Sequence, residues 1–203
     1  MHNNDISILN CTSGNVGSVV RMVEYLGARS VIINDKTDIE NSSKLIIPGV
    51  GRFDNAMTNI IKSGYMETLI EKIKSEKIYV LGICLGMQLL CMHSEEGDVD
   101  GLKLINANVN KFSQNNNLYK VPHIGWNKLK LLKNNPLFYN LSDCELRYYF
   151  VHSYYVKPIE DKISISSTNH GIDFCSAYNV NNIFGVQFHP EKSHHFGKEL
   201  IKN

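Results

Sequence analysis

Hydrophobic residues in the first half of the chain alternate between short runs and longer segments of helical spacing. Short apolar runs, typical of buried strands, occupy residues 6–9, 31–33, 45–47 and 78–83. Between them, apolar residues recur near every third or fourth position, which predicts helices over residues 16–28, 53–61 and 65–73. This alternation is typical of a mostly parallel, flavodoxin-like α/β sheet with helices on both faces. Sites in such sheets lie at the carboxyl ends of the strands.

The second half of the chain has a different pattern. Short β-like runs occupy residues 102–109, 118–121, 146–156, 163–167, 174–178 and 183–188. Asparagine-rich turns at residues 115–117 and 179–182 separate some of them. We therefore expect an antiparallel extension of the same sheet, followed by a short helix over residues 193–201. On this interpretation residues 1–203 form a single domain.

The run at residues 78–83 leads into the most informative stretch. Cys84 is flanked by Gly82 and Gly86, and an apolar segment that predicts a helix continues to Met92. This layout resembles a nucleophile elbow with cysteine in the place of serine. A tight strand-to-helix turn needs neighbours without bulk, and a helix N-terminus favours a thiolate. The backbone N–H of Leu85 could then stabilise an oxyanion. The alternative is a small buried cysteine without chemical function.

A cysteine nucleophile needs an imidazole and a group that orients it. The chain has eight histidines, and only His189 ends a well-formed apolar run with a carboxylate nearby, in His189-Pro190-Glu191. Pro190 fixes its own φ and ends the strand, which would hold His189 and Glu191 in a stiff turn. The alternative is a solvated turn.

Composition excludes several other classes of protein. Among 203 residues, 21 Lys and Arg balance 20 Asp and Glu, so no basic bias indicates nucleic acid as a partner. No apolar run approaches the roughly 18 residues needed to span a membrane. The N-terminal residues do not have the pattern of a signal peptide, and five scattered cysteines without a C-x-x-C pair are typical of reduced thiols. We expect a cytoplasmic protein without a metal site.

Three blocks of the sequence resemble the signatures of the class I (triad) glutamine amidotransferases, in the same order. These blocks are residues 48–51, 82–88 and 187–193. Within that family, residues 122–127, residues 149–154 and the pair Lys192-Ser193 are similar to the glutaminase subunits of imidazole glycerol phosphate synthases. The resemblance extends from residues 13–15 to the C-terminal helix.

The resemblance implies a role for each matching residue. Cys84 would be the nucleophile, His189 the general acid and base, and Glu191 the carboxylate that orients His189. The oxyanion would be held by the backbone of Leu85 and by the turn that contains Val50 and Gly51. Recognition of L-glutamine would involve Gly49, Gln88, Glu96, Ser153 and Tyr154. Ordinary helix positions for Gln88 and Glu96, and strand packing for Ser153 and Tyr154, are the alternatives.

The resemblance also implies a partner. Glutaminase subunits of this kind form a heterodimer with a (β/α)8 cyclase, to which they pass ammonia for imidazole glycerol phosphate synthesis in histidine biosynthesis, and no cofactor is implied. Asn15, Trp126, Tyr149 and Lys192 would lie on the docking face; Trp126 could instead be a core aromatic and Lys192 a solvated charge. Residues 10–13, Ser18 and residues 91–93 depart from the usual family pattern, and the first of these lies beside the expected docking face.

Three alternative functions remain open from the sequence. A paralogous subunit could supply ammonia for amidation of a nucleotide-activated sugar in surface-polysaccharide synthesis. A cysteine peptidase or chaperone-like hydrolase could share the elbow, although it would not require the blocks at residues 48–51 and 187–193. A non-catalytic binding module could retain the fold, although all three triad positions are filled.

Overall fold

A computed structural model describes residues 5–12, 15–113, 119–141 and 145–203. Its centre is a run of parallel strands in the order β2-β1-β3-β4-β14. The bounds are β1 (Asp5–Leu9), β2 (Arg29–Ile33), β3 (Lys44–Gly49), β4 (Tyr79–Cys84) and β14 (Ile183–Val186). This order follows the 2-1-3-4-5 pattern of flavodoxin-like folds. The predicted fold class is confirmed.

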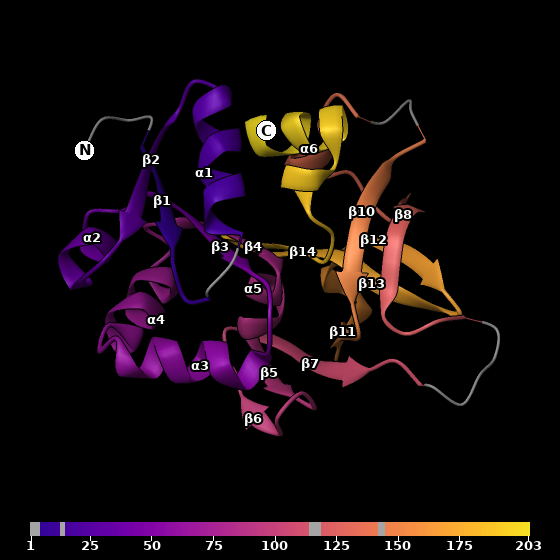
Figure 1. Ribbon diagram of the computed structural model, residues 1–203, viewed down its shortest axis with the longest axis horizontal. Helices are drawn as coiled ribbons and strands as arrows, with labels where there is room; N and C mark the ends of the chain where they lie inside the picture. The colour runs from indigo at the N-terminus through magenta and orange to yellow at the C-terminus, as the bar shows by residue number, and fades with distance from the viewer. Residues whose placement is uncertain (1–4, 13–14, 114–118, 142–144) are drawn as a thin grey trace.

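Helices cover both faces of this sheet (Figure 1). One face packs against α1 (Val16–Tyr25) and α6 (His194–Lys202); the other packs against α2 (Lys36–Glu40), α3 (Phe53–Lys62), α4 (Met66–Lys74) and α5 (Leu85–Leu89). The strands divide their side chains between the two faces because successive residues point in opposite directions. In β3, Ile46 packs with Val23 and Leu200 on the face covered by α1 and α6. Ile47 packs with Ile60 of α3 on the opposite face.

The second half of the chain extends the sheet with mostly antiparallel strands, as predicted. From β14 outward the order is β13 (Ile172–Val180), β11 (Tyr154–Pro158), β7 (Ile105–Lys111), β5 (Cys91–Ser94) and β6 (Val99–Asp100). Only β5 and β7 are parallel in this part. Two further strands join beside this path: β12 (Ser164–His170) pairs with β13, and β9 (Lys130–Leu131) pairs with β12. Short 3-10 turns lie at η1 (Pro136–Phe138), η2 (Asp161–Ile163) and η3 (Pro190–Lys192).

The expected strand over residues 146–156 is wrong as a single element. The chain breaks at Ser153: β10 (Arg147–His152) pairs with β8 (His123–Lys128) in a separate two-stranded sheet, and β11 joins the main sheet. Alternate side chains of β10 are buried, and Phe150 packs near Phe188 and Phe174 with ring centroids 5.8 and 6.0 Å apart. This aromatic packing holds the small sheet above the end of β14.

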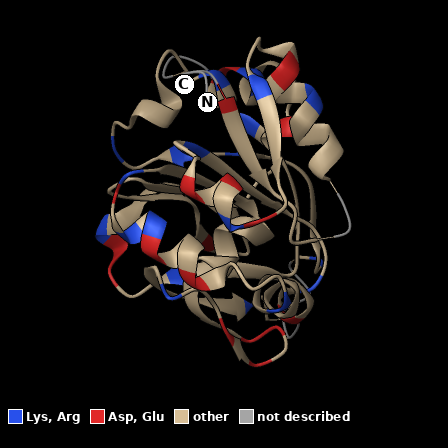
Figure 2. Cartoon of the chain, turned by 90° about the vertical axis from the view of Figure 1, so that its left-hand side faces the viewer, with Lys and Arg blue, Asp and Glu red and all other residues tan. Residues whose placement is uncertain are grey.

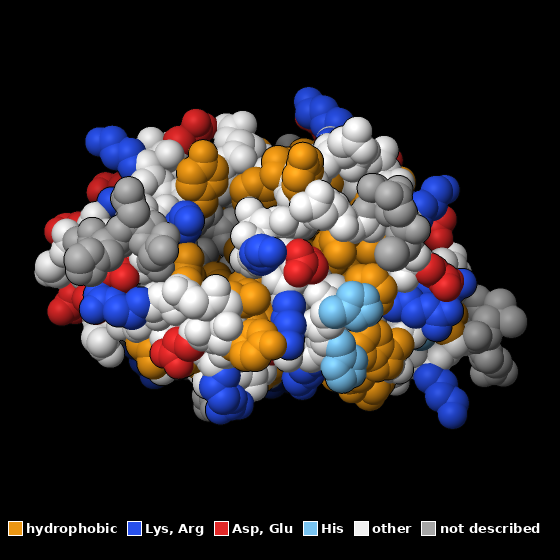
Figure 3. All heavy atoms as spheres, turned by 90° about the horizontal axis from the view of Figure 1, so that it is seen from above, with side chains coloured by type: hydrophobic (Ala, Val, Ile, Leu, Met, Phe, Trp, Pro, Cys, Tyr) orange, Lys and Arg blue, Asp and Glu red, His pale blue; other side chains and the backbone are white. Residues whose placement is uncertain are grey.

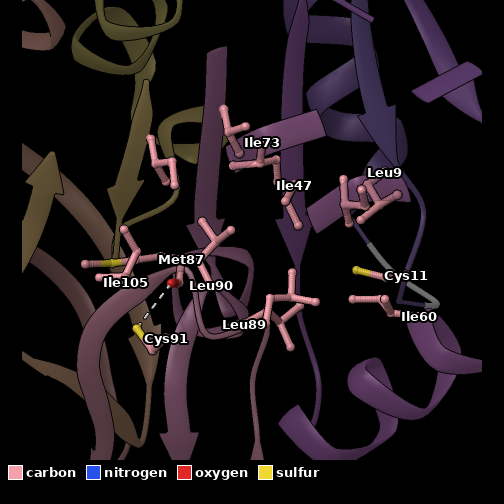
Figure 4. Close-up of a cluster of buried hydrophobic side chains, with 14 of the residues drawn as sticks. Leu9, Cys11, Ile47, Ile60, Ile73, Met87, Leu89, Leu90, Cys91 and Ile105 are labelled. Carbon is pink, nitrogen blue, oxygen red and sulfur yellow. Dashed lines mark hydrogen bonds between the residues drawn. The ribbon is translucent and has the colours of Figure 1, made fainter. Parts of the chain in front are cut away.

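The helix after Cys84 is shorter than predicted. It ends at Leu89, and Cys91 begins β5. The carbonyls of residues 89–91 accept backbone hydrogen bonds from the N–H groups of residues 102–105. They therefore do not accept the hydrogen bonds that would continue the helix. Figure 4 shows Cys91, Leu90 and Ile105 together in this buried cluster, with the Cys91 thiol donating to the Met87 carbonyl at 3.7 Å.

Two other expectations differ from the structure. Residues 119–121 form no strand, while Leu118 and the turn at residues 115–117 lie outside the described residues. The short helix α2 was not predicted because it has only five residues; a reciprocal capping box between Asp35 and Asp38 stabilises its start.

Acidic and basic residues are interspersed along the chain in Figure 2. Every helix in the described part of the chain is too short or too polar to cross a bilayer.

Candidate active site

Cys84 lies where β4 meets α5. It is the last residue of the strand and the N-cap of the helix, with φ 53° and ψ −108°, a backbone conformation that is uncommon for a residue with a side chain. A Cβ added to Gly82 would lie 2.7 Å from the backbone of Met87, and one added to Gly86 would lie 1.7 Å from the Ile47 carbonyl oxygen. The two flanking glycines therefore let α5 fold back directly onto β3 and β4.

The neighbouring strand carries His189 to the same edge of the sheet. In the parallel pairing of β14 with β4, Val186 lies opposite Ile83, so the residues that follow β14 lie beside Cys84. The backbone of His189 makes three hydrogen bonds. Its N–H donates to the Tyr149 carbonyl at 2.9 Å, and its carbonyl accepts from the Lys192 N–H at 3.0 Å and from the Ser193 hydroxyl at 2.6 Å. The strand register and these bonds determine where the imidazole lies.

His189 and Glu191 form a buried pair. Nδ1 of His189 lies 2.6 Å from Oε1 of Glu191, and their side chains are 0% and 1% exposed. Asn15 Nδ2 donates to the same carboxylate oxygen. Because Glu191 accepts at Nδ1, the neutral ring presents Nε2 as its basic nitrogen. Nε2 is buried without a hydrogen-bond partner among the described residues, and Cys84 is close enough to perturb the ring electrostatically.

The ionisation of this pair is set by competing effects. Burial opposes a charge on His189, but the neighbouring Cys84 and Glu191 outweigh it and raise the pKa of His189 to about 10. Burial likewise opposes a charge on Glu191, but the hydrogen bond and charge of His189, together with Asn15, keep the pKa of Glu191 below its usual value. The site therefore favours an imidazolium beside a carboxylate.

The other described thiols are in different surroundings. Burial raises the pKa of Cys11 and of Cys175 to about 12, and burial also raises the pKa of Cys91. These three cysteines stay protonated at neutral pH. Among the described cysteines, only Cys84 adjoins an imidazole, as a cysteine nucleophile requires.

The turn expected to hold an oxyanion adjoins the cysteine. Gly49 pairs with Cys84 in the register of β3 and β4, and Val50 and Gly51 follow it directly. A Cβ added to Gly49 would lie 2.9 Å from Cβ of Leu85, so the turn and the start of α5 are in close contact. Gly51 has φ 107°, a conformation that favours glycine.

The residues expected to bind glutamine lie near one another. Gln88 is buried, and its Nε2 donates to the Tyr154 carbonyl at 3.1 Å. The Tyr154 hydroxyl group is close enough to Glu96 for the two to interact electrostatically. Ser153 is half-buried, and its carbonyl accepts from the Phe112 N–H at 3.1 Å.

Glu96 does not lie on a helix, contrary to the alternative weighed for it. It lies in the turn between β5 and β6, half-buried, and its carboxylate accepts from the N–H of Phe53 at 3.0 Å. Burial raises the pKa of Glu96, although the bond from Phe53 and the charge of Arg52 oppose that shift.

Three of the expected docking residues form a surface cluster beside this site. Trp126 is 45% exposed, stacks on His194 with ring centroids 5.3 Å apart, and meets Tyr149 edge-on at 6.3 Å. The Lys192 ammonium lies 5.7 Å from the Tyr149 ring centroid. We call these four residues the Trp126 cluster. Figure 3 views the molecule from the side of α6 and shows histidine side chains next to hydrophobic ones. Asn15, by contrast, contacts Glu191.

Sequence reasoning missed one residue that contacts the cysteine. Gln187 is fully buried, and its Nε2 lies 3.6 Å from Sγ of Cys84. Gln187 begins the signature block at residues 187–193 and lies just beyond the end of β14, and this position was a signal that could have indicated it.

Comparisons with known proteins identify the family of this chain. The family model "Glutamine amidotransferase class-I" matches residues 7–203. A relative in Methanococcus maripaludis, "Imidazole glycerol phosphate synthase subunit HisH 2", is 46% identical over 198 residues, covering 98% of this chain and 97% of the relative. The HisH subunit of Leptospira interrogans is 42% identical, with 98% of both chains covered.

Solved structures of low sequence identity share the fold. A crystal structure of a glutamine amidotransferase has a TM-score of 0.75 at 14% identity, covering 97% of this chain and 95% of the other. A glutamine amidotransferase of Thermotoga maritima has a TM-score of 0.68 at 18% identity, covering 100% of this chain and 82% of the other. The signature blocks lie together in one site, and the family model matches nearly the whole length of the chain. The chain therefore belongs to the class I glutamine amidotransferases.

Proposed function

We propose that this chain is the glutaminase subunit of an imidazole glycerol phosphate synthase. It hydrolyses L-glutamine to glutamate and ammonia, and a cyclase subunit uses the ammonia. The observation that carries the proposal is the buried His189–Glu191 pair beside Cys84, in a chain whose relatives of 40–46% identity over nearly full length are named as subunits of that synthase.

The reaction uses a Cys84–His189–Glu191 triad. Transfer of the Cys84 proton to Nε2 of His189 gives the thiolate and the imidazolium that the site favours, and this thiolate attacks the side-chain amide carbon of glutamine. Glu191 stabilises the imidazolium that results and keeps the ring in place. His189 then returns the proton to the leaving ammonia. In the second half, His189 activates a water molecule that hydrolyses the γ-glutamyl thioester.

Backbone amides stabilise the negative oxygen of each tetrahedral intermediate. One is the N–H of Leu85, at the N-terminus of α5. The other comes from the turn of Val50 and Gly51, which continues the strand that pairs with β4 at Cys84. The glycines of this turn would permit the peptide reorientation that brings a donor into place.

Glutamine is held by residues that surround the elbow. Both Nε2 hydrogens of Gln88 are used by protein acceptors, which leaves its carbonyl oxygen to accept a bond from the substrate. The Glu96 carboxylate suits the substrate ammonium group, and Tyr154 lies near it. Gly49 and Ser153 are the other two residues that would contact the substrate.

The ammonia passes to a (β/α)8 cyclase that docks beside the site, and the complex works in the cytoplasm without a cofactor in this subunit. The Trp126 cluster is the anchor of that docking face, and Asn15 contacts Glu191 of the triad. An exposed tryptophan supported by other rings is the kind of residue that dominates binding at an interface.

The test is the release of glutamate from glutamine by the chain mixed with a histidine-pathway cyclase and its ribonucleotide. Cys84→Ala should abolish glutamate release, and Cys175→Ala, which removes a buried thiol in β13, should retain it. Near wild-type turnover by Cys84→Ala would contradict the assignment. Casein cleavage would favour the peptidase, and failure to react with diazo-oxo-norleucine would favour the binding module.

A second candidate is the subunit that supplies ammonia for amidation of a nucleotide-activated sugar. The relatives in Methanococcus maripaludis and Pseudomonas aeruginosa are each named HisH 2, which indicates more than one such subunit in those organisms. Formation of imidazole glycerol phosphate by the reconstituted pair supports the first proposal. Glutaminase activity that responds only to the partner of the sugar pathway supports the second.

A further inference from the structure

Two side-chain amides connect the cysteine with the expected substrate residues. Gln187 and Gln88 are 0% and 5% exposed. Nε2 of Gln88 lies 2.9 Å from Oε1 of Gln187, and Nε2 of Gln187 lies 3.6 Å from Sγ of Cys84. A buried chain of polar atoms therefore runs from the elbow helix to the sulfur.

Hydrogen-bond chemistry fixes the direction of this chain. The Tyr154 carbonyl can only accept, so the Gln88 atom 3.1 Å from it must be the amide nitrogen. The Gln187 atom that faces that nitrogen must then be the carbonyl oxygen. It follows that Gln187 directs its N–H toward Cys84.

The far end of the chain is fixed as well. Nδ1 of His152 lies 2.7 Å from the same Tyr154 carbonyl, and Nε2 of His152 lies 3.0 Å from Nδ1 of His123. Burial lowers the pKa of His152 to about 3 and that of His123 to about 4, so both rings are neutral at physiological pH. A neutral His152 that donates from Nδ1 keeps the Tyr154 carbonyl in place, and Gln88 with it.

We propose that Gln187 is a positioning residue for glutamine hydrolysis, whose N–H donates to the Cys84 sulfur and stabilises the thiolate while its carbonyl orients Gln88. A hydrogen bond to the charged form of an acid favours that form. Through one amide, the nucleophile and a substrate-binding side chain are held in a fixed relation. This inference deepens the proposed function and rests on it for the identity of the reaction.

The test is the pH dependence of Cys84 alkylation by iodoacetamide in the full chain, followed by mass spectrometry of the Cys84 peptide. Gln187→Met keeps the length of the side chain and removes both polar atoms. The pH of half-maximal alkylation should rise by about one unit relative to the wild type, because the donor to the sulfur is lost. The reagent requires neither glutamine nor a partner, so this result is independent of whether the chain is a glutaminase.

Asn182→Leu is the matched control. Asn182 is also buried, and its Nδ2 donates to the carbonyls of Ile73 and Ile78 at 3.0 and 2.7 Å, at the opposite end of β14 from Gln187. The Asn182→Leu substitution should lower the melting temperature, because it removes a buried amide with two hydrogen bonds. It should leave the pH profile of Cys84 alkylation unchanged, because that amide does not face the sulfur.

Gln187→Glu provides a second variant if Gln187→Met does not fold. Glutamate keeps the shape of the glutamine side chain and an oxygen that can accept from Gln88. It places a carboxylate oxygen where the N–H of Gln187 faced the Cys84 sulfur. The half-maximal pH should again rise, because repulsion opposes ionisation of the thiol. A folded Gln187 variant with the wild-type alkylation profile would overturn the proposal.

Discussion

At the scale of single residues, the site depends on two opposite charges that would each be costly to bury alone. His189 and Glu191 are almost completely excluded from solvent, and each favours the charged form of the other. Removing one member of a buried pair leaves an uncompensated charge. Asn15 adds a neutral donor to the same Glu191 oxygen that faces His189.

This pair predicts how stability changes with pH. The pKa of His189 is raised in the folded chain to about 10, so its contribution is complete below its ordinary value near 6.5 and is lost between that pH and about 10. The pKa of Glu191 is lowered, so its contribution is present above its ordinary value near 4.5 and is lost as the pH falls below it. Urea unfolding of the wild type should therefore give a free energy that declines from pH 6.5 to 10.

Glu191→Gln is the matched variant, because it keeps the shape and removes the charge. The pKa of His189 should fall, so the decline in unfolding free energy between pH 6.5 and 10 should become smaller than in the wild type. Its kcat for glutamine should also drop by roughly 100-fold or more, since the imidazolium loses its carboxylate. A variant with the same pH slope as the wild type would show that the carboxylate does not set the charge on His189.

At the scale of elements, the sequence predicted what is local. The strand before Cys84, the helix after it and the close approach implied by Gly82 and Gly86 all follow from residues within one short stretch. The break at Ser153 could not be predicted in this way, because β10 and β11 form one apolar run and differ only in the distant strands with which they pair. The end of α5 likewise depends on residues 102–105.

The elbow itself gives a prediction about packing. Gly86→Ala places a Cβ 1.7 Å from the backbone oxygen of Ile47, so α5 and β3 must separate. We expect a loss of several kcal/mol of stability, at the upper end of the range for single substitutions. Thermal and urea unfolding measure it.

Gly17→Ala is the control for this substitution. Gly17 lies in α1, and an added Cβ would meet only the Arg21 side chain, at 3.6 Å. It should raise stability by about 0.5–1 kcal/mol, because alanine loses less conformational freedom in a helix. Equal effects of the two substitutions would mean that the close approach at Gly86 does not constrain the elbow.

At the scale of the whole molecule, one edge of the sheet gathers residues from distant parts of the chain. Cys84 ends β4, His189 follows β14, Asn15 precedes α1 and Trp126 lies in the small sheet with Tyr149. Family resemblance predicted the identity of these residues, but periodicity alone could not predict that the β8–β10 sheet brings the Trp126 cluster next to the triad. The role of Gln187, the first residue of the block at residues 187–193, was found only from the structure, because it depends on two long-range contacts.

This arrangement predicts that the Trp126 cluster determines partner affinity. Trp126→Ala removes an exposed ring that is held by stacking on His194 and by edge contact with Tyr149. We expect binding to the cyclase to weaken about 30-fold, which is about 2 kcal/mol, as for an aromatic anchor at the centre of an interface. Titration calorimetry with the purified cyclase measures the affinity, and alkylation of Cys84 should be unchanged in the variant.

Tyr79→Ser separates this effect from a general loss of exposed aromatic surface. Tyr79 is 63% exposed and begins β4, at the opposite end of the strand from Cys84. A strand rises about 3.3 Å per residue, so Tyr79 lies roughly 17 Å from the edge where the cyclase would dock. Its substitution should leave the affinity unchanged. If both variants bind the cyclase as the wild type does, the partner docks elsewhere, and the ammonia would then have to leave the site by a route that does not pass the Trp126 cluster.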